Sequence, residues 1–271
     1  MTLFRKLFYV FHERIRNTEY FENYFFLFGL LLSRELKVRY KSTALGYLWA
    51  LANPLFFVLV YYFAFRIIMR IGVEDYASFL LTGLFPWLMI QNSVNGAGFS
   101  LINNASFIKN LSNKRSLFPV VWVTTELIHL VVSLPILFLL ISIDRWELVS
   151  INIFDLALVI IVTYLFALPI VIGLSVIACF LRDIQYLVVI FLQLFFWLTP
   201  IVYPVAIVPE PYRVWFSVNP VAMIIGEWRN VFSGTNLDNM VLTYLLVINF
   251  VLMLVALKAW KKSVATISDV L

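Results

Sequence analysis

Glu126 and His129 are two ionisable residues inside a long apolar stretch, three positions apart in the run TELIH. Side chains three apart lie on the same face of a helix, so the two can meet. A charged acid at the centre of a membrane helix costs about 2.5 to 3.5 kcal/mol, and such residues usually face a bundle interior or a cavity. The pair is therefore either a polar contact in a pathway through a membrane or between subunits, or a neutral glutamate hydrogen-bonded to its neighbour.

The rest of the chain contains no further arrangement that predicts catalysis or metal binding. None of the nine glycines is followed by lysine, so there is no P-loop to hold ATP phosphates. His12 and His129 have no cluster of Cys, Asp or Glu ligands around them. The single cysteine, Cys179, lies in an apolar run and allows no intrachain disulfide. We therefore expect no metal site, no cofactor in this chain and no enzyme activity.

The composition is that of an integral membrane protein. Of the 271 residues, 63% are hydrophobic and only 13% are charged, against about 25% in soluble domains. The first 16 residues are basic and lack the apolar core of a cleavable signal, so we expect the N-terminus to stay in the cytoplasm. The net charge of +5 reflects Lys and Arg between apolar spans, which indicates membrane topology and not nucleic-acid binding.

Six intervals approach the roughly 20 mostly apolar residues that a membrane crossing needs. They are residues 42–65, 76–108, 116–143, 156–181, 184–209 and 239–257. The second becomes polar at Gln91, so its membrane part should run from Phe79 to about Gly98. The predicted inner segments then hold 15 of the 20 Lys and Arg residues, as the positive-inside rule requires. The sequence thus predicts an all-α, six-span protein with both termini in the cytoplasm.

Two segments flank or interrupt these spans. Residues 24–32 are apolar for nine positions and then alternate with Arg34, Lys37, Arg39 and Lys41, which favours an amphipathic helix on the inner membrane surface. A plain anchor for the first span is the alternative. Residues 198–220 carry five of the ten prolines, which break helices, so the fifth span should end near Pro200 to Pro204.

A further single crossing by residues 211–232 would place Lys258, Lys261 and Lys262 outside, against the charge rule. We therefore expect residues 205–232 to form two short re-entrant helices that dip from the outer side and return at Asn219-Pro220, where Pro biases Asn219 away from helix. They would cap an outer channel mouth, with Trp215 and Phe216 at the interface. A loop lying on the lipid is the alternative.

Aromatic residues make up 17% of the chain, and many fall inside the predicted spans. Trp49, Phe56 and Phe63 recur every seven residues, joined by Tyr61 and Tyr62, and in the fifth span Phe191 and Phe195 share a face near Phe196 and Trp197. Packing against lipid is the ordinary explanation. As a group they also suit an aromatic-lined conduit, since the C–H faces of sugar rings stack on aromatic rings.

The run RELKVRYKSTALGYLWALANPLF, residues 34–56, resembles the start of the membrane subunits of type-2 ABC exporters that move polysaccharides. Three more matches follow in order. ASFIKN at 105–110 resembles the cytoplasmic loop that contacts the ATPase, TPIVYP at 199–204 resembles the motif closing the fifth span, and Asn219-Pro220 with Glu227 and Arg229 resembles the outer segment. One departure is Asn113-Lys114, where the family often has Phe-Pro.

The resemblance implies a single transmembrane domain, 1–271, with a cytoplasmic amphipathic N-terminus (1–41), a six-span bundle (42–260) and an outer re-entrant segment (205–232). It implies a homodimer in the bacterial inner membrane with two copies of a separate ATPase, which binds ATP and Mg. The implied substrate is an undecaprenyl-linked O-antigen polysaccharide. Alternatives are a capsular polysaccharide or teichoic acid exporter, a small lipid or drug exporter, and a membrane acyl- or glycosyltransferase using Glu126 and His129.

The resemblance also assigns three groups of residues. Coupling to the ATPase, through a short coupling helix and the surface helix, is expected at Ser106, Phe107, Ile108, Lys109, Arg34, Lys37 and Arg39. Channel-lining aromatics are expected at Trp49, Phe56, Tyr61, Tyr62, Phe191 and Phe195. An outer gate is expected at Pro200, Tyr203, Pro204, Asn219, Pro220, Glu227 and Arg229.

Overall fold

The structure is a computed structural model of the chain and describes residues 24–39, 49–70, 72–73, 75–110, 114–145 and 151–270. Every regular element in these ranges is a helix. The predicted N-terminal segment up to residue 23 and the start of the first predicted span, 40–48, lie outside the described residues. For a few helical residues, including Lys109, the description stops at the backbone.

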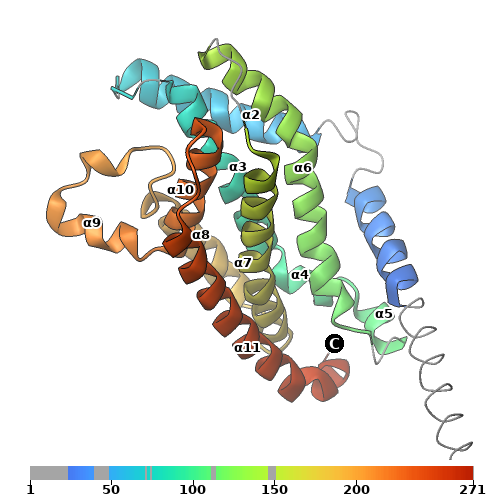
Figure 1. Ribbon diagram of the computed structural model, residues 1–271. Coiled ribbons are helices and arrows are strands. Elements are labelled where there is room, and N and C mark those ends of the chain that lie inside the picture. Colours follow the sequence, from blue (N-terminus) through green and yellow to red (C-terminus); the bar gives the residue numbers. More distant parts are fainter. Residues whose placement is uncertain are drawn as a thin grey trace, which may run out of the picture.

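The helices are arranged in one bundle, with α9 standing apart at its side (Figure 1). A helix at residues 24–39 comes first. It is followed by α2 (Trp49–Tyr61), the π-helical η2 (Tyr62–Ile68), α3 (Tyr76–Asn95), α4 (Ala97–Ile102), α5 (Ala105–Asn110), α6 (Leu117–Arg145), α7 (Ile153–Phe180), α8 (Ile184–Trp197), the short 3₁₀ turn η3 (Val205–Ile207), α9 (Glu210–Ser217), α10 (Pro220–Ser233) and α11 (Asn239–Val270).

Helix α7 is the centre of the bundle and packs against α3, α4, α6, α8, α10 and α11. It is apolar on all sides, which is the pattern of a helix surrounded by other helices. Two of its polar side chains, Thr163 and Ser175, are satisfied within the helix, because they donate to carbonyl oxygens of the preceding turn. Asn152 caps its start by accepting a hydrogen bond from the Phe154 N–H.

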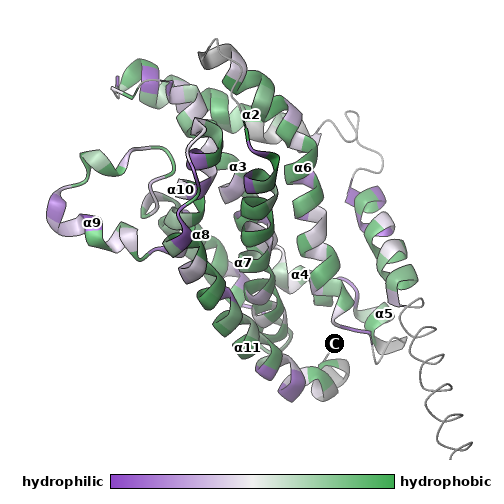
Figure 2. Ribbon diagram, in the orientation of Figure 1, coloured by the Kyte–Doolittle hydropathy of each residue, from purple (hydrophilic) through white to green (hydrophobic). Residues whose placement is uncertain are grey.

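Three helical segments are long and apolar enough to cross a membrane, judged by length and composition: Leu117–Ser142, Ile153–Phe180 and Asn239–Val264. Shorter apolar helices lie at Leu55–Ile68 and Ile184–Trp197. Fourteen residues of helix rise about 21 Å, less than the roughly 30 Å of a hydrocarbon core. Hydrophobic residues dominate α6, α7, α8 and α11 (Figure 2). The count of six crossings therefore stays a prediction.

Two clusters of buried side chains form the core. The larger one joins α3, α6, α7, α10 and α11 around Tyr76, Trp87, Trp228 and Phe232, each about 1% exposed or less. The smaller cluster lies at the end of the bundle that carries α4 and α5, which we call the α5 end. It brings together Leu31, Leu101, Ile108, Leu117 and Trp260. The helix at 24–39, which begins and ends close to the expected positions, thus packs on the bundle through Leu31.

The proline-rich region forms two short helices, α9 and α10, separated at Asn219-Pro220 as expected. Asn219 Oδ1 accepts hydrogen bonds from the N–H groups of Val221 and Ala222, and Pro220 occupies the first turn. The two helices differ in environment. Helix α9 buries no residue, whereas α10 buries seven, including Trp228, whose Nε1–H donates to Thr163 Oγ1 at 3.0 Å. Only α10 is therefore part of the bundle core.

Candidate functional site

Two groups of polar contacts stand out, one near the α5 end and one at the opposite end of α8. The first is the ion-pair cluster, formed by Arg39, Glu126 and His129. The second surrounds residues 198–204, which join α8 to η3 and which we call the proline segment. Each group ties together helices that are far apart in the sequence.

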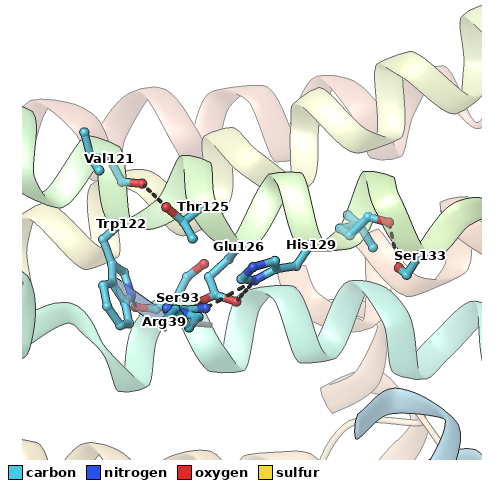
Figure 3. Close-up of polar contacts among 9 residues, drawn as sticks. Arg39, Ser93, Val121, Trp122, Thr125, Glu126, His129 and Ser133 are labelled. Atoms are coloured by element: carbon cyan, nitrogen blue, oxygen red, sulfur yellow. Dashed lines mark hydrogen bonds and ion pairs between the residues drawn. The ribbon is translucent and has the colours of Figure 1, made fainter. Parts of the chain in front are cut away.

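The ion-pair cluster links the helix at 24–39 to α6 (Figure 3). Arg39 Nη1 lies 2.5 Å from Glu126 Oε1 and 3.2 Å from His129 Nδ1. The contact expected between Glu126 and His129 is present, at 3.4 Å. Glu126 is buried, with its side chain 3% exposed. Because its nearest partner is an arginine, the structure shows an ion pair in place of the neutral glutamate that was one of the two interpretations. No sequence signal near Glu126 indicates Arg39 as its partner.

The Arg39 guanidinium also lies over the Trp122 ring, 4.8 Å from the ring centroid. Trp122 Nε1–H in turn donates to the carbonyl oxygen of Ser93 in α3, at 3.1 Å. The ring lies directly against Gly96, where an added Cβ would come within 1.8 Å of it. The helix at 24–39, α6 and the turn between α3 and α4 are therefore joined through one arginine and one indole ring.

The short helix α5 lies where the coupling helix is expected. Arg34 reaches it from the helix at 24–39: its Nη1 donates to Asn104 Oδ1 at 2.7 Å, and its guanidinium lies 4.6 Å from the Phe107 ring centroid. Tyr24 Oη and Ser116 Oγ, 3.1 Å apart, add a further contact. The structure thus brings the two expected coupling segments into contact with each other.

The individual coupling residues differ in exposure. Phe107 is 43% exposed, and Ser106 and Lys37 are exposed as well. Ile108 is fully buried in the smaller core cluster, so it fixes α5 to the bundle and offers no surface to a partner. Lys109 lies in α5, but its side chain is outside the described residues.

The proline segment is buried although it is not helical. Ile201 and Val202 are both 0% exposed. Their carbonyl oxygens accept hydrogen bonds from side chains of other helices: Arg229 Nη2 donates to Ile201 at 2.9 Å, and the Tyr76 hydroxyl donates to Val202 at 2.8 Å. The Arg229 guanidinium also stacks on Phe79, 3.7 Å from the ring centroid.

Other expected gate residues hold the same region together. Asn219 Nδ2–H donates to Thr199 Oγ1 at 3.1 Å, and the Tyr203 hydroxyl donates to the Trp197 carbonyl at 2.6 Å. Glu227 is 3% exposed and accepts from the Asp238 backbone N–H, which fixes the connection from α10 to α11. Pro200 is buried, whereas Pro204 and Pro220 are half-buried. Glu227 and Arg229 therefore act within the chain as structural contacts.

The expected channel aromatics fall into two groups. Trp49, Phe56 and Phe191 are exposed by 46%, 63% and 60%. The others are half-buried and belong to a network of ring contacts that joins α2, α3 and α8. Phe191 contacts Phe195, which contacts Trp87. Trp87 also contacts Phe196, which contacts Tyr61. A separate contact joins Tyr62 to Tyr76.

We predict that Arg229→Ala destabilises the protein by about 1 to 3 kcal/mol, because it leaves the buried Ile201 carbonyl without its donor. Arg213→Ala is a matched control. Arg213 lies on the exposed helix α9 and also donates to two backbone carbonyls, those of Val208 and Ala206. Thermal unfolding of the purified protein in detergent measures both. Equal losses in the two variants would show that burial of the proline segment is not what makes Arg229 important.

We predict that Glu126→Ala destabilises the protein by about 3 kcal/mol, because Arg39 loses its buried partner. Glu210→Ala is the control: Glu210 pairs with Arg213 at 3.9 Å but is 87% exposed, so its loss should cost about 0 to 1 kcal/mol. A double change, Arg39→Leu with Glu126→Leu, should restore more than half of the lost stability. No recovery in the double variant, measured by the unfolding midpoint, would contradict an ion-pair role.

Residues 26–233 match the family model described as ABC-2 type transporter. An O-antigen export system permease protein RfbA of Klebsiella pneumoniae is 34% identical over 240 residues, which are 88% of this chain and 93% of that protein. The protein of the same name from Myxococcus xanthus is 29% identical over 210 residues, 75% of this chain and 80% of its own. The polysialic acid transport protein KpsM of Escherichia coli is 26% identical over 239 residues, 85% and 91% of the two chains.

The family match covers most of the described helices, from the helix at 24–39 to the end of α10. It therefore includes both the ion-pair cluster and the proline segment. The relative from Klebsiella pneumoniae adds similarity over nearly the full length of both proteins. This chain belongs to the membrane subunits of the ABC-2 type transporters.

Proposed function

We propose that this chain is the permease of an ATP-driven exporter that moves a lipid-linked O-antigen polysaccharide across the bacterial inner membrane. The observation that carries the proposal is the 34% identity to O-antigen export permeases over 88% of this chain. The apolar helices and the absence of a P-loop agree with a membrane subunit that depends on a separate ATPase. The substrate would be carried on undecaprenyl, in a protein with six crossings and both termini in the cytoplasm.

A capsular polysaccharide is the second candidate substrate. It is supported by the 26% identity to the polysialic acid transport protein over 85% of this chain. Both candidates need the same architecture, so the helices do not separate them. The higher identity to the O-antigen permeases favours the first candidate.

The contacts at the α5 end suggest how ATP hydrolysis would be coupled to the membrane helices. An ATPase docking on α5 would press on Phe107, which lies against Arg34. The helix at 24–39 carries Arg34 and, five residues later, Arg39, which is paired with Glu126 of α6. Movement of α5 would therefore reach α6 through one helix and one ion pair, whose glutamate is buried.

A homodimer would place the exposed aromatics of two subunits opposite each other. Phe56 on α2 and Phe191 on α8 are both at least 60% exposed, and Trp197 at the end of α8 is 53% exposed. Such a lining offers ring faces to sugars and no fixed charge. Outside the bundle core, α9 presents Trp215, 69% exposed, where it would lie at the outer interface beside the gate.

Deleting this gene should leave the glycan inside the cell, because no permease would carry it outward. Surface glycan is measured by immunoblot of whole cells and of fractions, and plasmid-borne wild type should restore it. Separate blots for O-antigen and for capsule distinguish the two candidate substrates. Normal amounts of both surface glycans in the deletion strain would contradict the proposed function.

Phe107→Ala should weaken ATPase binding about tenfold or more, because exposed aromatic anchors are often hot spots that contribute about 2 kcal/mol. The measurement is the amount of ATPase that co-purifies with the permease. Phe154→Ala is the control, since Phe154 is 80% exposed at the start of α7, at the opposite end of the bundle. Unchanged co-purification with Phe107→Ala would exclude α5 as the docking helix.

A further inference from the structure

A cavity of about 570 Å³ lies between α8 and the rest of the bundle. Its walls come from five helices, α3, α7, α8, α10 and α11, and every lining side chain is apolar or aromatic. They include Trp87, Phe166, Leu187, Val188, Phe191 and Leu252. The cavity reaches the protein surface, because Leu187 and Phe191 line it and are nevertheless 57% and 60% exposed.

An apolar space of this size is not filled by water, since water needs polar partners that these walls do not offer. Leaving it empty would be costly, because the free-energy penalty of a cavity grows with its volume. In a membrane the material at its opening is lipid, and hydrocarbon chains match walls of this kind. The surroundings of α8 therefore point to a hydrocarbon chain as the occupant.

The length of the cavity agrees with the length of one lipid leaflet. Its wall along α8 runs from Ile184 to Phe195, a rise of about 16 Å. Half of a hydrocarbon core is about 15 Å thick. In the proposed orientation Ile184 lies at the cytoplasmic end, so the cavity spans the inner leaflet.

Basic side chains lie beyond that end. Arg182 is exposed and precedes Ile184 by two residues, and Lys258 is exposed and follows the lining residue Leu252 by six residues on α11, about 9 Å further along. Lys261 and Lys262 continue the basic stretch on α11, and one acid, Asp183, follows Arg182 in the chain. The excess of positive charge would attract an anionic headgroup.

We propose that this cavity is a binding site for an anionic phospholipid of the inner leaflet, with one acyl chain between α8 and the bundle and the headgroup near Arg182 and Lys258. The inference rests on the proposed membrane orientation. The lipid would hold α8 in position, because α8 buries only Leu192 and Phe196 among its own side chains. Of the exposed aromatics that would face a glycan, Phe191 also lines this cavity, whereas Phe56 and Trp197 do not.

The site is tested by native mass spectrometry of the full chain with its ATPase. The complex is purified from nanodiscs made of phosphatidylglycerol or of phosphatidylcholine. Wild type should retain phosphatidylglycerol. Val188→Phe, which fills the cavity, should lose it, whereas Val189→Phe, on the neighbouring residue outside the lining, should retain it. Arg182→Gln and Lys258→Gln should each lower the preference for phosphatidylglycerol about fivefold. Leu174→Phe fills the same cavity from α7 and replaces Val188→Phe if that variant fails to fold.

Any of these results would overturn the inference: no retained phospholipid in wild type, retention that Val188→Phe leaves unchanged, or retention of an undecaprenyl lipid in place of phospholipid. Dissociation of the dimer by Val188→Phe alone would also overturn it, since the cavity would then be a subunit interface. Lipid retention is measured without transport. Its failure therefore leaves the export proposal standing, and a failure of export leaves the retention result unchanged.

Discussion

The fold depends on one constraint, which is that backbone polar groups away from water must find partners inside the protein. Helices satisfy it by themselves, but the proline segment cannot, because prolines remove donors and end α8 at Trp197. Arg229, Tyr76 and Tyr203 supply the missing partners to three carbonyls. Two of these donors, from α10 and α3, attach the segment to the bundle, so the end of α8 is fixed through hydrogen bonds as well as apolar packing.

Helix α3 connects the proline segment to the α5 end. It begins at Tyr76, which binds the proline segment, and near its other end the Ser93 carbonyl accepts from Trp122. Trp122 lies under Arg39, whose partner is Glu126. The two groups of polar contacts therefore share one 20-residue helix. A displacement of the helix at 24–39 would act on both α6 and α3, which gives the bundle a physical connection between its ends.

Much of this architecture follows from the sequence because it depends on local signals. Apolar length locates the helices, proline density locates the end of α8, and Asn219-Pro220 locates the start of α10. Contacts between distant residues leave no such signal. Nothing near Glu126 indicates Arg39, 87 positions earlier, and nothing in ASFIKN shows that Ile108 points into the core while Phe107 remains exposed. Exposed and buried positions on a six-residue helix are set by its neighbours.

The contrast between α7 and α8 shows where the bundle is able to change shape. Helix α7 is surrounded by other helices, whereas α8 buries two side chains, adjoins a large apolar cavity and is attached to the proline segment at one end. Interiors that are close-packed resist displacement, and local stability falls where few apolar contacts are made. A transporter must open without unfolding. Helix α8 is therefore freer to move than α7, and the hydrogen-bonded proline segment would provide the fixed point about which it turns.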